Sequence, residues 1–354
     1  MRVHQFLTSF AYGDAIGNEA AEIRDFLRRQ GIESEIFCLF HHPRYAAQVH
    51  NYLEYDRFAA PDDVVIFHFS IGSPVTKKFL RLAARKVIVY HNITPHHFFL
   101  DYHRTLAKDC YKGRIELKSF VPHVDLALGD SEYNRKELEE AGFPRTGVLP
   151  LVMDFDRFDL PVVPVLRRLY DDGKTNILTV GRIIPNKCVE DVLKAFSVYQ
   201  RQYNPDSRLF LVGEHRGFER YLAALQDLVT RLGVRHVHFT GHVPQAEAIS
   251  YWKLAHLYLH LSEHEGFCAP IPEAYRAGLP VVAFAAAAVP ETMAGAGLQV
   301  HRKEFSSIAA LIDTVLSVPA LKDQVVAGQR QALAAYTRER SGSILLNYLR
   351  GLAA

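Results

Sequence analysis

Two glutamates eight residues apart form the strongest chemical pattern in the sequence. They are the ends of the segment EGFCAPIPE, Glu265 to Glu273, which directly follows an apolar run at 256–261 typical of a buried strand. A helix beginning inside this segment would turn its first N–H groups and its dipole toward the strand end, where they suit a diphosphate. A carboxylate accepts two hydrogen bonds at once, as vicinal sugar hydroxyls require. The alternative is that Glu273 merely belongs to a first helical turn and that Glu265 is solvated.

A second pattern places cations at a strand end. The segment GRIIPNK, Gly181 to Lys187, follows an apolar run at 177–180. Glycine lets the backbone pass close to a ligand, and Arg182 and Lys187 would neutralise a leaving diphosphate. The alternative is a solvated loop with two unrelated cations.

A third pattern, GDAIGN at 13–18, follows a predicted first strand at 3–7. This is the position where doubly wound domains hold phosphates. The segment lacks the third glycine of GxGxxG, and the sequence has no GxxxxGK[ST] loop. An NAD-dependent dehydrogenase and a P-loop ATPase are therefore disfavoured.

Histidines cluster after another predicted strand, at 86–90. His91, His96 and His97 lie within seven residues, which suggests metal binding, but no cysteine or carboxylate with matching spacing accompanies them. Pro95 also breaks any helical i, i+4 geometry. We therefore predict that His91 lines a cleft and that the site holds no metal.

These segments need elements that position them, and the chain alternates between strand and helix patterns. Before residue 149 we predict strands at 3–7, 35–39, 63–69, 86–90 and 124–128, with helices at 18–30, 77–84 and 131–141. A proline-rich stretch at 149–173 breaks the alternation, so we interpret its DxD, Asp154 to Asp156, as a boundary turn rather than a metal site. Beyond it we predict strands at 177–180, 208–212, 236–240, 256–261 and 279–284, helices at 189–203, 217–232, 245–254 and 271–277, and a helical tail from about 305.

This organisation predicts an α/β protein of two Rossmann-like, doubly wound domains. We place the first domain at 1–160 and the second at 161–339, with a C-terminal helix at about 340–354 that packs back on the first. The second domain carries the two strongest patterns, so we expect the main ligand there.

Composition excludes several classes of protein. Of the 354 residues 49% are hydrophobic and 23% charged, and the formal net charge is only +2, which disfavours disorder and nucleic-acid binding. Four cysteines without a CxxC pair favour a reduced cytoplasmic protein. The sequence shows neither a signal-peptide pattern nor about 18 consecutive apolar residues. Peripheral attachment at the inner face of the membrane is left open by the basic segment 77–86, for which a solvated helix face is the ordinary interpretation.

Taken together, the motifs resemble those of the retaining glycosyltransferases of family 4. The resemblance runs over nearly the whole chain and rests on GDAIGN at 13–18, HFSIGSP at 68–74, HNITP at 91–95, VGRIIPNK at 180–187, LVGE at 211–214, FTGHVP at 239–244 and E-x7-E at 265–273. GDAIGN, HFSIGSP and HNITP resemble a subgroup of bacterial polysaccharide synthesis. The resemblance implies the GT-B fold, in which two Rossmann-like domains face a central cleft.

The resemblance also implies roles for individual residues. Arg182 and Lys187 would hold the donor diphosphate, Glu273 the ribose hydroxyls, and Glu265 the hydroxyls of the donor sugar. Gly13 would lie beneath the diphosphate or beside the acceptor, and His91 would lie near the anomeric centre or C6 of the sugar. Val243 would contact the base through its backbone. The other donor-binding positions would be Gly181, Gly213, Gly266 and Phe267. Where many members have paired glycines before Pro-Glu, this chain has AFAAAAVPE, so Glu291 stays outside the predicted site.

The implied activity is transfer of a hexose, with retention and without metal or cofactor, from a nucleotide diphosphate sugar to a glycan or lipid-linked acceptor. UDP-glucose and GDP-mannose are the donors we expect, with a slight preference for UDP. No separate nucleophile is evident, so the diphosphate itself would take the acceptor proton. The alternatives are a GT-B epimerase or hydrolase and a non-enzymatic protein that binds sugar nucleotides.

Overall fold

The computed structural model describes residues 1–11 and 13–353, so residue 354 of the predicted last helix lies outside it. The chain divides into two compact units. Unit 1 contains residues 1–97, 105–154 and those from 335 onward, and unit 2 contains 98–104 and 155–334. The change of unit after residue 154 comes six residues before the predicted boundary. The transfer of 98–104 to unit 2 has no counterpart in the sequence pattern.

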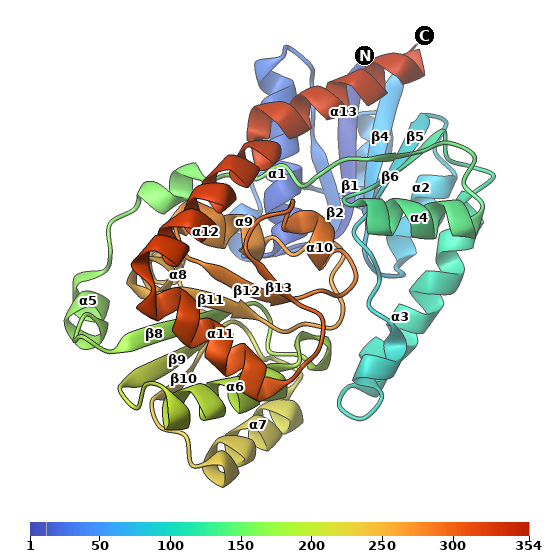
Figure 1. The fold of residues 1–354 in the computed structure, drawn as a ribbon. Coiled ribbons are helices and arrows are strands. Elements are labelled where there is room, and N and C mark those ends of the chain that lie inside the picture. Colours follow the sequence, from blue (N-terminus) through green and yellow to red (C-terminus); the bar gives the residue numbers. More distant parts are fainter. Residues whose placement is uncertain (12, 354) are drawn as a thin grey trace. The chain divides into compact units, whose positions relative to one another are not determined.

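Unit 1 is built on a seven-stranded parallel sheet with the order β3-β2-β1-β4-β5-β6-β7 (Figure 1). Its strands are β1 Arg2–Phe10, β2 Ile36–His41, β3 His50–Asn51, β4 Asp63–Phe69, β5 Arg85–Tyr90, β6 Leu126–Gly129 and β7 Thr146–Val148. Its helices are α1 Ala15–Arg29, α2 Pro74–Leu80, α3 Arg104–Leu117, α4 Glu132–Ala141 and α13 Arg338–Ala353. Every residue of β4 is buried, as expected for a central parallel strand covered on both faces.

The last helix belongs to unit 1 although it follows unit 2 in the chain. Arg338 of α13 pairs with Glu22 of α1, and the backbone N–H of Val148 donates to the Tyr348 hydroxyl at 3.2 Å. Leu345 and Leu349 are fully buried in the same core as the strands of this sheet. The chain therefore closes unit 1 with its final helix.

Unit 2 has a six-stranded parallel sheet with the order β10-β9-β8-β11-β12-β13. The strands are β8 Thr175–Val180, β9 Ser207–Val212, β10 Val237–Gly241, β11 Leu257–His260, β12 Val281–Phe284 and β13 Leu298–Val300. The helices are α5 Pro164–Tyr170, α6 Val189–Gln202, α7 Glu219–Leu232, α8 Gln245–Leu254, α9 Pro270–Ala277, α10 Val289–Thr292, α11 Phe305–Ser317 and α12 Pro319–Ala332.

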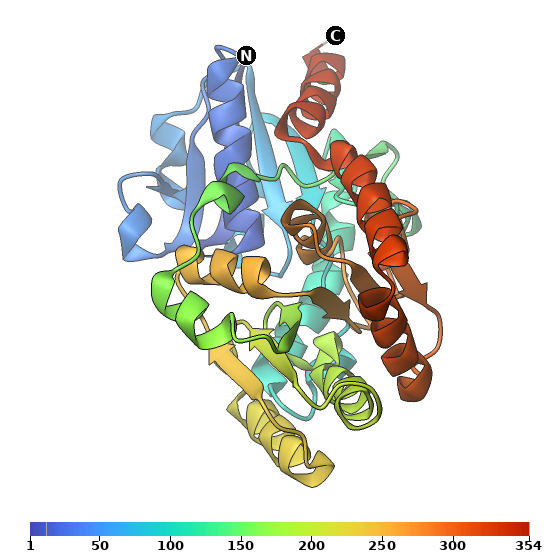
Figure 2. The same cartoon turned by 60° about the vertical axis from the view of Figure 1, so that its left-hand side comes forward.

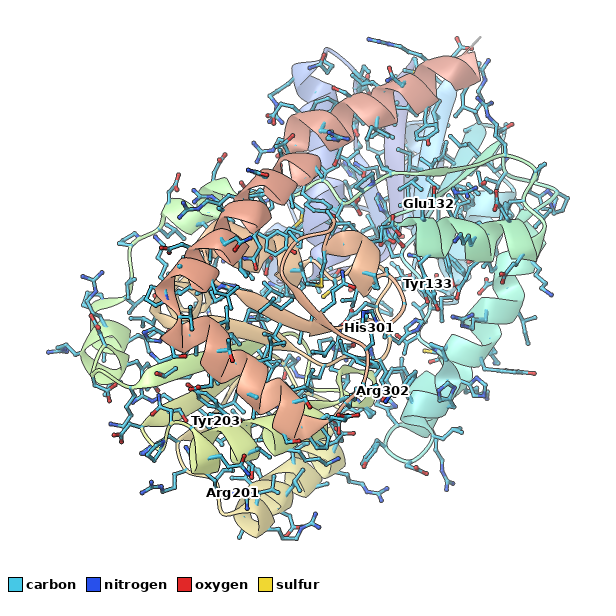
Figure 3. The ribbon with its side chains drawn as sticks, viewed as in Figure 1. Glu132, Tyr133, Arg201, Tyr203, His301 and Arg302 are labelled. Carbon is cyan, nitrogen blue, oxygen red and sulfur yellow. The ribbon has the colours of Figure 1, made fainter. Side chains whose placement is uncertain are left out.

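Helices cover the sheet of unit 2 in two groups. Helix α6 packs against α7 and α11, whereas α5 packs against α8, α8 against α9, and α9 against α12 (Figure 2). Charged and polar side chains lie on their outer surfaces, for example Arg201 and Tyr203 at the end of α6 (Figure 3). Strands covered on both faces favour apolar residues, and the apolar runs within β8, β9 and β11 are the pattern that predicted them.

Most predicted elements are present, with ends shifted by a few residues. The predicted helix at 77–84 is α2 at 74–80, because Pro74 supplies a first helical residue and Ser73 precedes it in extended conformation. The sequence analysis missed the short strands β3, β7 and β13 and the helices α3, α5 and α10. Two- or three-residue strands carry too few side chains to show a period.

Candidate active site

The two strongest sequence patterns lie at one place in unit 2. Strand β8 pairs with β9 on one side and β11 on the other, so the strand order changes direction at β8. Ligands of doubly wound sheets bind at the carboxyl ends of the strands at such a switch point. The segment 181–187 follows β8 and the segment 261–269 follows β11. The topology therefore brings the predicted cations and carboxylates to the same strand ends.

Gly213 allows the loops after β8 and β9 to touch. A Cβ atom at this position would lie 1.9 Å from the carbonyl oxygen of Gly181, so no other residue fits without moving the backbone. Gly181 itself has φ +144°, a conformation that L side chains rarely adopt. Packing therefore requires glycine at 213, and backbone conformation favours it at 181, whether or not a ligand approaches them.

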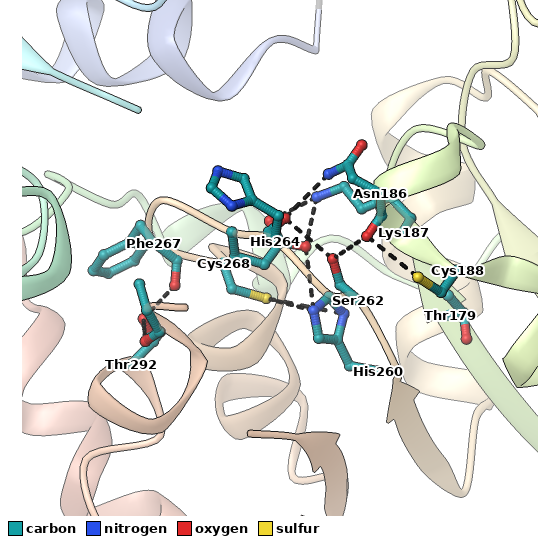
Figure 4. Close-up of polar contacts among 12 residues, drawn as sticks. Thr179, Asn186, Lys187, Cys188, His260, Ser262, His264, Phe267, Cys268 and Thr292 are labelled. Carbon is teal, nitrogen blue, oxygen red and sulfur yellow. Dashed lines mark hydrogen bonds and ion pairs between the residues drawn. The ribbon is translucent and has the colours of Figure 1, made fainter. Parts of the chain in front are cut away.

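Asn186 joins the β8 loop to the β11 loop. Its side-chain amide donates to the carbonyl of His264 at 3.1 Å, and its own carbonyl accepts from the Ser262 hydroxyl at 2.9 Å (Figure 4). The N–H of Glu263 donates to the same carbonyl at 3.0 Å. Sequence reasoning missed Asn186, whose role appears only when the two loops are adjacent.

Lys187 and Glu265 form a two-point ion pair at the centre of this arrangement. The ammonium nitrogen lies 2.6 Å from each carboxylate oxygen, and Nε2 of His260 lies 3.2 Å from Oε1. Burial alone would raise the pKa of Glu265, but Lys187 and His260 outweigh it and hold that pKa well below its usual range. Glu265 is therefore an ionised, buried carboxylate and not the solvated residue of the alternative interpretation.

Glu273 is paired with a residue that the sequence analysis did not consider. Its carboxylate binds the guanidinium of Arg157, which lies in the short helix at 156–159. Burial raises the pKa of Glu273 more than Arg157 lowers it. The sequence analysis could not predict this pair, because 116 residues separate Arg157 from Glu273.

The remaining predicted donor-site residues of unit 2 follow the carboxyl ends of β8, β10 and β11. The guanidinium of Arg182 is exposed and sits 6.0 Å from the centre of the Phe218 ring. The carbonyl of Phe267 accepts from the Thr292 hydroxyl, which fixes the loop before α9, and Val243 packs at the edge of the core of unit 2. The residue after Phe267, Cys268, has φ +79°, so the backbone turns sharply next to Glu265.

His91 belongs to unit 1, where it ends a buried row of polar side chains. The Gln5 side-chain amide donates to the Ala20 carbonyl, so its oxygen faces Nε2 of His68 at 2.9 Å and that nitrogen must carry the proton. Nδ1 of His68 then accepts from Nε2 of His91 at 3.0 Å. The His91 ring is only 3% exposed. Its orientation is therefore fixed by buried partners.

Two carboxylates flank His91, contrary to the sequence argument that none accompanies the histidines. Oδ2 of Asp130 lies 3.3 Å from Nδ1 of His91, and Oε2 of Glu19 lies 3.5 Å from Nε2. Burial lowers the pKa of His91, but Glu19 and Asp130 together raise it above its usual value. Burial raises the pKa of Glu19 to about 7, although His91 opposes this. The carboxylates come from α1 and from the end of β6, so spacing along the chain could not reveal them.

Gly13 lies in the turn before α1 with φ +74°, and Asp14 begins the helix by accepting from the Gly17 N–H at 3.0 Å. The DxD segment forms no shared carboxylate site, since Asp154 pairs with Arg338 in unit 1 and Asp156 starts a short helix in unit 2. The turn interpretation is consistent with this placement.

Among the residues that the structure describes, three groups of side chains have atoms close enough to hold a metal ion. They are Glu19, His68 and His91; His260, Glu265 and Cys268; and Cys188, Asp191 and Glu263. Each of the first two contains a predicted site residue. The prediction of a metal-free site therefore needs the direct test given below.

Comparison with known proteins shows which proteins this chain resembles. Residues 168–340 match the family model described as glycosyl transferases group 1, a range that covers most of unit 2. The chain is 25% identical over 311 residues to the O-antigen chain mannosyltransferase B of Escherichia coli, covering 84% of this chain and 75% of that protein. It is 27% identical over 255 residues to the GDP-mannose-dependent alpha-(1-6)-phosphatidylinositol monomannoside mannosyltransferase of Mycolicibacterium smegmatis, covering 68% and 65%. The chain thus spans about two thirds of the length of the latter.

Solved structures share the fold. HepE of Anabaena, in complex with UDP, has a TM-score of 0.72 at 19% identity, with 99% of this chain and 100% of that chain covered. Sucrose-phosphate synthase of Thermosynechococcus elongatus has a TM-score of 0.78 at 15% identity, with 99% of each chain covered. The predicted architecture of two Rossmann-like domains is confirmed, and residues 168–340 are similar to the glycosyl transferases of group 1.

Among the described residues, no single helix is both long and apolar enough to cross a membrane. One bent pair, 305–317 with 319–352, passes on length and composition when taken together, across a bend of 96°.

Proposed function

We propose that this protein is a retaining, metal-independent mannosyltransferase that moves mannose from GDP-mannose to a glycan or lipid-linked acceptor in polysaccharide or glycolipid synthesis. The observation that carries the proposal is the ion pair between the buried Glu265 and the half-buried Lys187 at the switch point of unit 2. The choice of donor follows the curated relatives, since the Mycolicibacterium protein is named as GDP-mannose-dependent. This reverses the slight preference for UDP drawn from the sequence alone.

Lys187 is suited to hold the donor diphosphate. An ammonium group has three N–H donors, and two of them point at the oxygens of Glu265. The third is left for a phosphate oxygen, with the exposed Arg182 as a second cation. The pair with Glu265 orients the Lys187 ammonium before the donor arrives, so little reorganisation is needed when the diphosphate departs.

The two carboxylates then bind different parts of the donor. Glu265 accepts hydrogen bonds from the sugar hydroxyls and Glu273 from the ribose, while Gly266 and Phe267 lie beside the diphosphate and Val243 beside the base. His91 and Gly13 act from unit 1, His91 on the sugar. The acceptor hydroxyl attacks the anomeric carbon on the side that the diphosphate leaves, and a diphosphate oxygen takes its proton. Charge stabilisation and positioning supply the rate enhancement.

The test is a transfer reaction with GDP-mannose and UDP-glucose, each labelled in the sugar, against glycan and lipid-linked acceptors. We expect transfer from GDP-mannose and an α-linked product, read from the anomeric coupling by NMR. A β-linked product would contradict retention. Turnover without acceptor would instead indicate the epimerase or hydrolase, and tight donor binding with no turnover a non-enzymatic protein.

The four cysteines are buried, and no disulfide joins them in the described part of the chain, which suits a reducing compartment such as the cytoplasm. We propose that the reaction takes place there, at the inner face of the membrane when the acceptor is a lipid.

A further inference from the structure

The outer side of α3 presents lysines and large apolar side chains together. Helical spacing places five exposed residues on one side of the helix and of the turn that follows it. We refer to them as the α3 stripe: Lys108, Tyr111, Lys112, Ile115 and Lys118. Sequence analysis did not predict this helix at all.

The opposite side of α3 is held firmly in unit 1. Buried residues line it at every turn: Ala107, Cys110, Gly113 and Leu117. A Cβ on Gly113 would lie 2.8 Å from the backbone nitrogen of Gly72, so the helix and the 71–72 segment are in direct contact. Arg114 also turns away from the stripe and donates to the Ile93 carbonyl at 2.9 Å. The stripe is thus a fixed surface.

The lysines of the stripe carry unneutralised charge. Within the described part of the chain, none of the three lies within 4 Å of a carboxylate oxygen, whereas Lys78 in α2 binds Asp56 at 2.6 Å. The acidic residues of α3, Asp109 and Glu116, are half-buried along one edge. There they line a hollow of about 300 Å³ together with Lys112 and with Lys77 of α2. The exposed side itself contains no acid.

Two large apolar side chains lie among these lysines. Tyr111 is 53% exposed, although its ring edge contacts His96, and Ile115 is 58% exposed one turn later. A solvated face would favour polar residues at both positions. Tyrosine suits a membrane interface because its ring is apolar and its hydroxyl is wet.

We infer that the α3 stripe docks this protein on an anionic lipid bilayer. Lysines attract the negative surface, and Tyr111 and Ile115 enter the headgroup region between them. The basic segment 77–86 is a poorer candidate, because Lys78 is ion-paired and Phe79 and Leu82 are buried. The inference does not depend on glycosyl transfer, since lipid binding needs neither donor nor acceptor.

The test is co-sedimentation of the full chain with vesicles of phosphatidylcholine containing 30% phosphatidylglycerol, and with pure phosphatidylcholine. We expect binding to the anionic vesicles that weakens in high salt, and little binding to the neutral ones. Each lysine near such a surface contributes roughly fivefold, so Lys108→Glu with Lys112→Glu should weaken binding at least about 30-fold. Tyr111→Ser with Ile115→Ser should weaken it in low and high salt alike.

Matched controls separate the stripe from general charge and hydrophobicity. Arg29→Glu with Lys136→Glu makes the same charge change at two exposed sites elsewhere in unit 1, and Phe40→Ser with Leu53→Ser removes two equally exposed apolar side chains. Both controls should bind like the unmodified protein, and thermal melts should show that all variants are folded. The inference is overturned if the unmodified protein ignores anionic vesicles, or if the control pairs lose binding as strongly as the stripe pairs.

Discussion

At the residue scale, the candidate donor site contains two carboxylates, Glu265 and Glu273, whose charges are paired with Lys187 and Arg157 before any ligand binds. The residue types were readable from the sequence, because Glu265, Glu273, Arg182 and Lys187 all follow predicted strands. Their partnerships were not, since 78 residues separate Lys187 from Glu265 and only the parallel pairing of β8 with β11 brings them together. A lysine assigned to phosphate and a glutamate assigned to sugar turn out to be each other's partner.

The two carboxylates should respond differently to loss of charge. Glu273→Gln should weaken GDP and GDP-mannose binding alike, by about 1.5–3 kcal/mol, because both ligands carry the ribose. Glu265→Gln should leave GDP affinity unchanged or higher, because Lys187 is freed for the diphosphate, while turnover falls. Calorimetric titration with GDP and steady-state rates for both variants measure this. If Glu265→Gln loses GDP affinity as strongly as Glu273→Gln, the proposed division of roles is wrong.

The buried row at His91 should make stability depend on pH. The folded-state pKa of Glu19 is raised to about 7, so its burial costs nothing in acid and costs stability as pH rises from about 4.5 to 7. The raised pKa of His91 acts in the same direction. Protonated His91 stabilises the folded protein below the pKa that His91 has in the unfolded chain, and this stabilisation is lost as pH rises through the higher pKa of the folded state. Glu19→Gln should therefore gain stability relative to the unmodified protein between pH 5 and pH 8. Urea unfolding at both pH values measures the difference, and an equal difference at both would refute the account.

At the element scale, the strand and helix pattern predicted the sheets but not their detail. Strand β4 was recognised because most of its residues are apolar. Strand β3 was missed because two residues are too few to show a period. Helix α3 was missed because its exposed side mixes lysines with Tyr111 and Ile115, which blurs the apolar stripe that identifies a helix. Its partner residues Gly113 and Gly72 reveal their packing only in three dimensions.

The contact between the β8 and β9 loops should be sensitive to a single methyl group. Gly213→Ala would place its Cβ against the Gly181 carbonyl and should destabilise the protein by about 1–3 kcal/mol, with weaker GDP binding. Gly328→Ala is the matched control, because it lies inside α12 with open space around it and should be neutral or slightly stabilising. Thermal melts compare the two, and equal melting temperatures would show that the loops are not held as described.

At the scale of the whole molecule, sequence motifs spread over both units identified the fold class, while the division of the chain could be seen only in the structure. Residues 98–104 belong to unit 2, where the Phe99 ring lies 5.7 Å from that of Phe218, and α13 returns to unit 1. Local composition does not show that these two segments pack on the other unit, because their packing depends on contacts between residues far apart in the sequence.

The account also predicts that transfer needs no metal. Activity should survive excess EDTA, since Lys187 and Arg182 supply the positive charge that a metal would otherwise provide. The EDTA experiment can distinguish the two outcomes, because the groups of side chains at His91 and at His260 have atoms close enough to hold a metal ion. Loss of activity in EDTA, restored by Mn²⁺ or Mg²⁺, would refute metal independence.

The central claim is that the Lys187–Glu265 pair forms a nucleoside diphosphate site, and calorimetric titration of GDP tests it most directly. Lys187→Met combined with Glu265→Gln removes both charges and so avoids an unpaired buried carboxylate. The control is Lys194→Met, which removes another lysine of unit 2 paired with a carboxylate, Asp191. We predict that GDP binds the unmodified protein and the control alike and that the double variant, still folded, binds at least about tenfold more weakly. Equal GDP affinity in all three proteins would contradict the account.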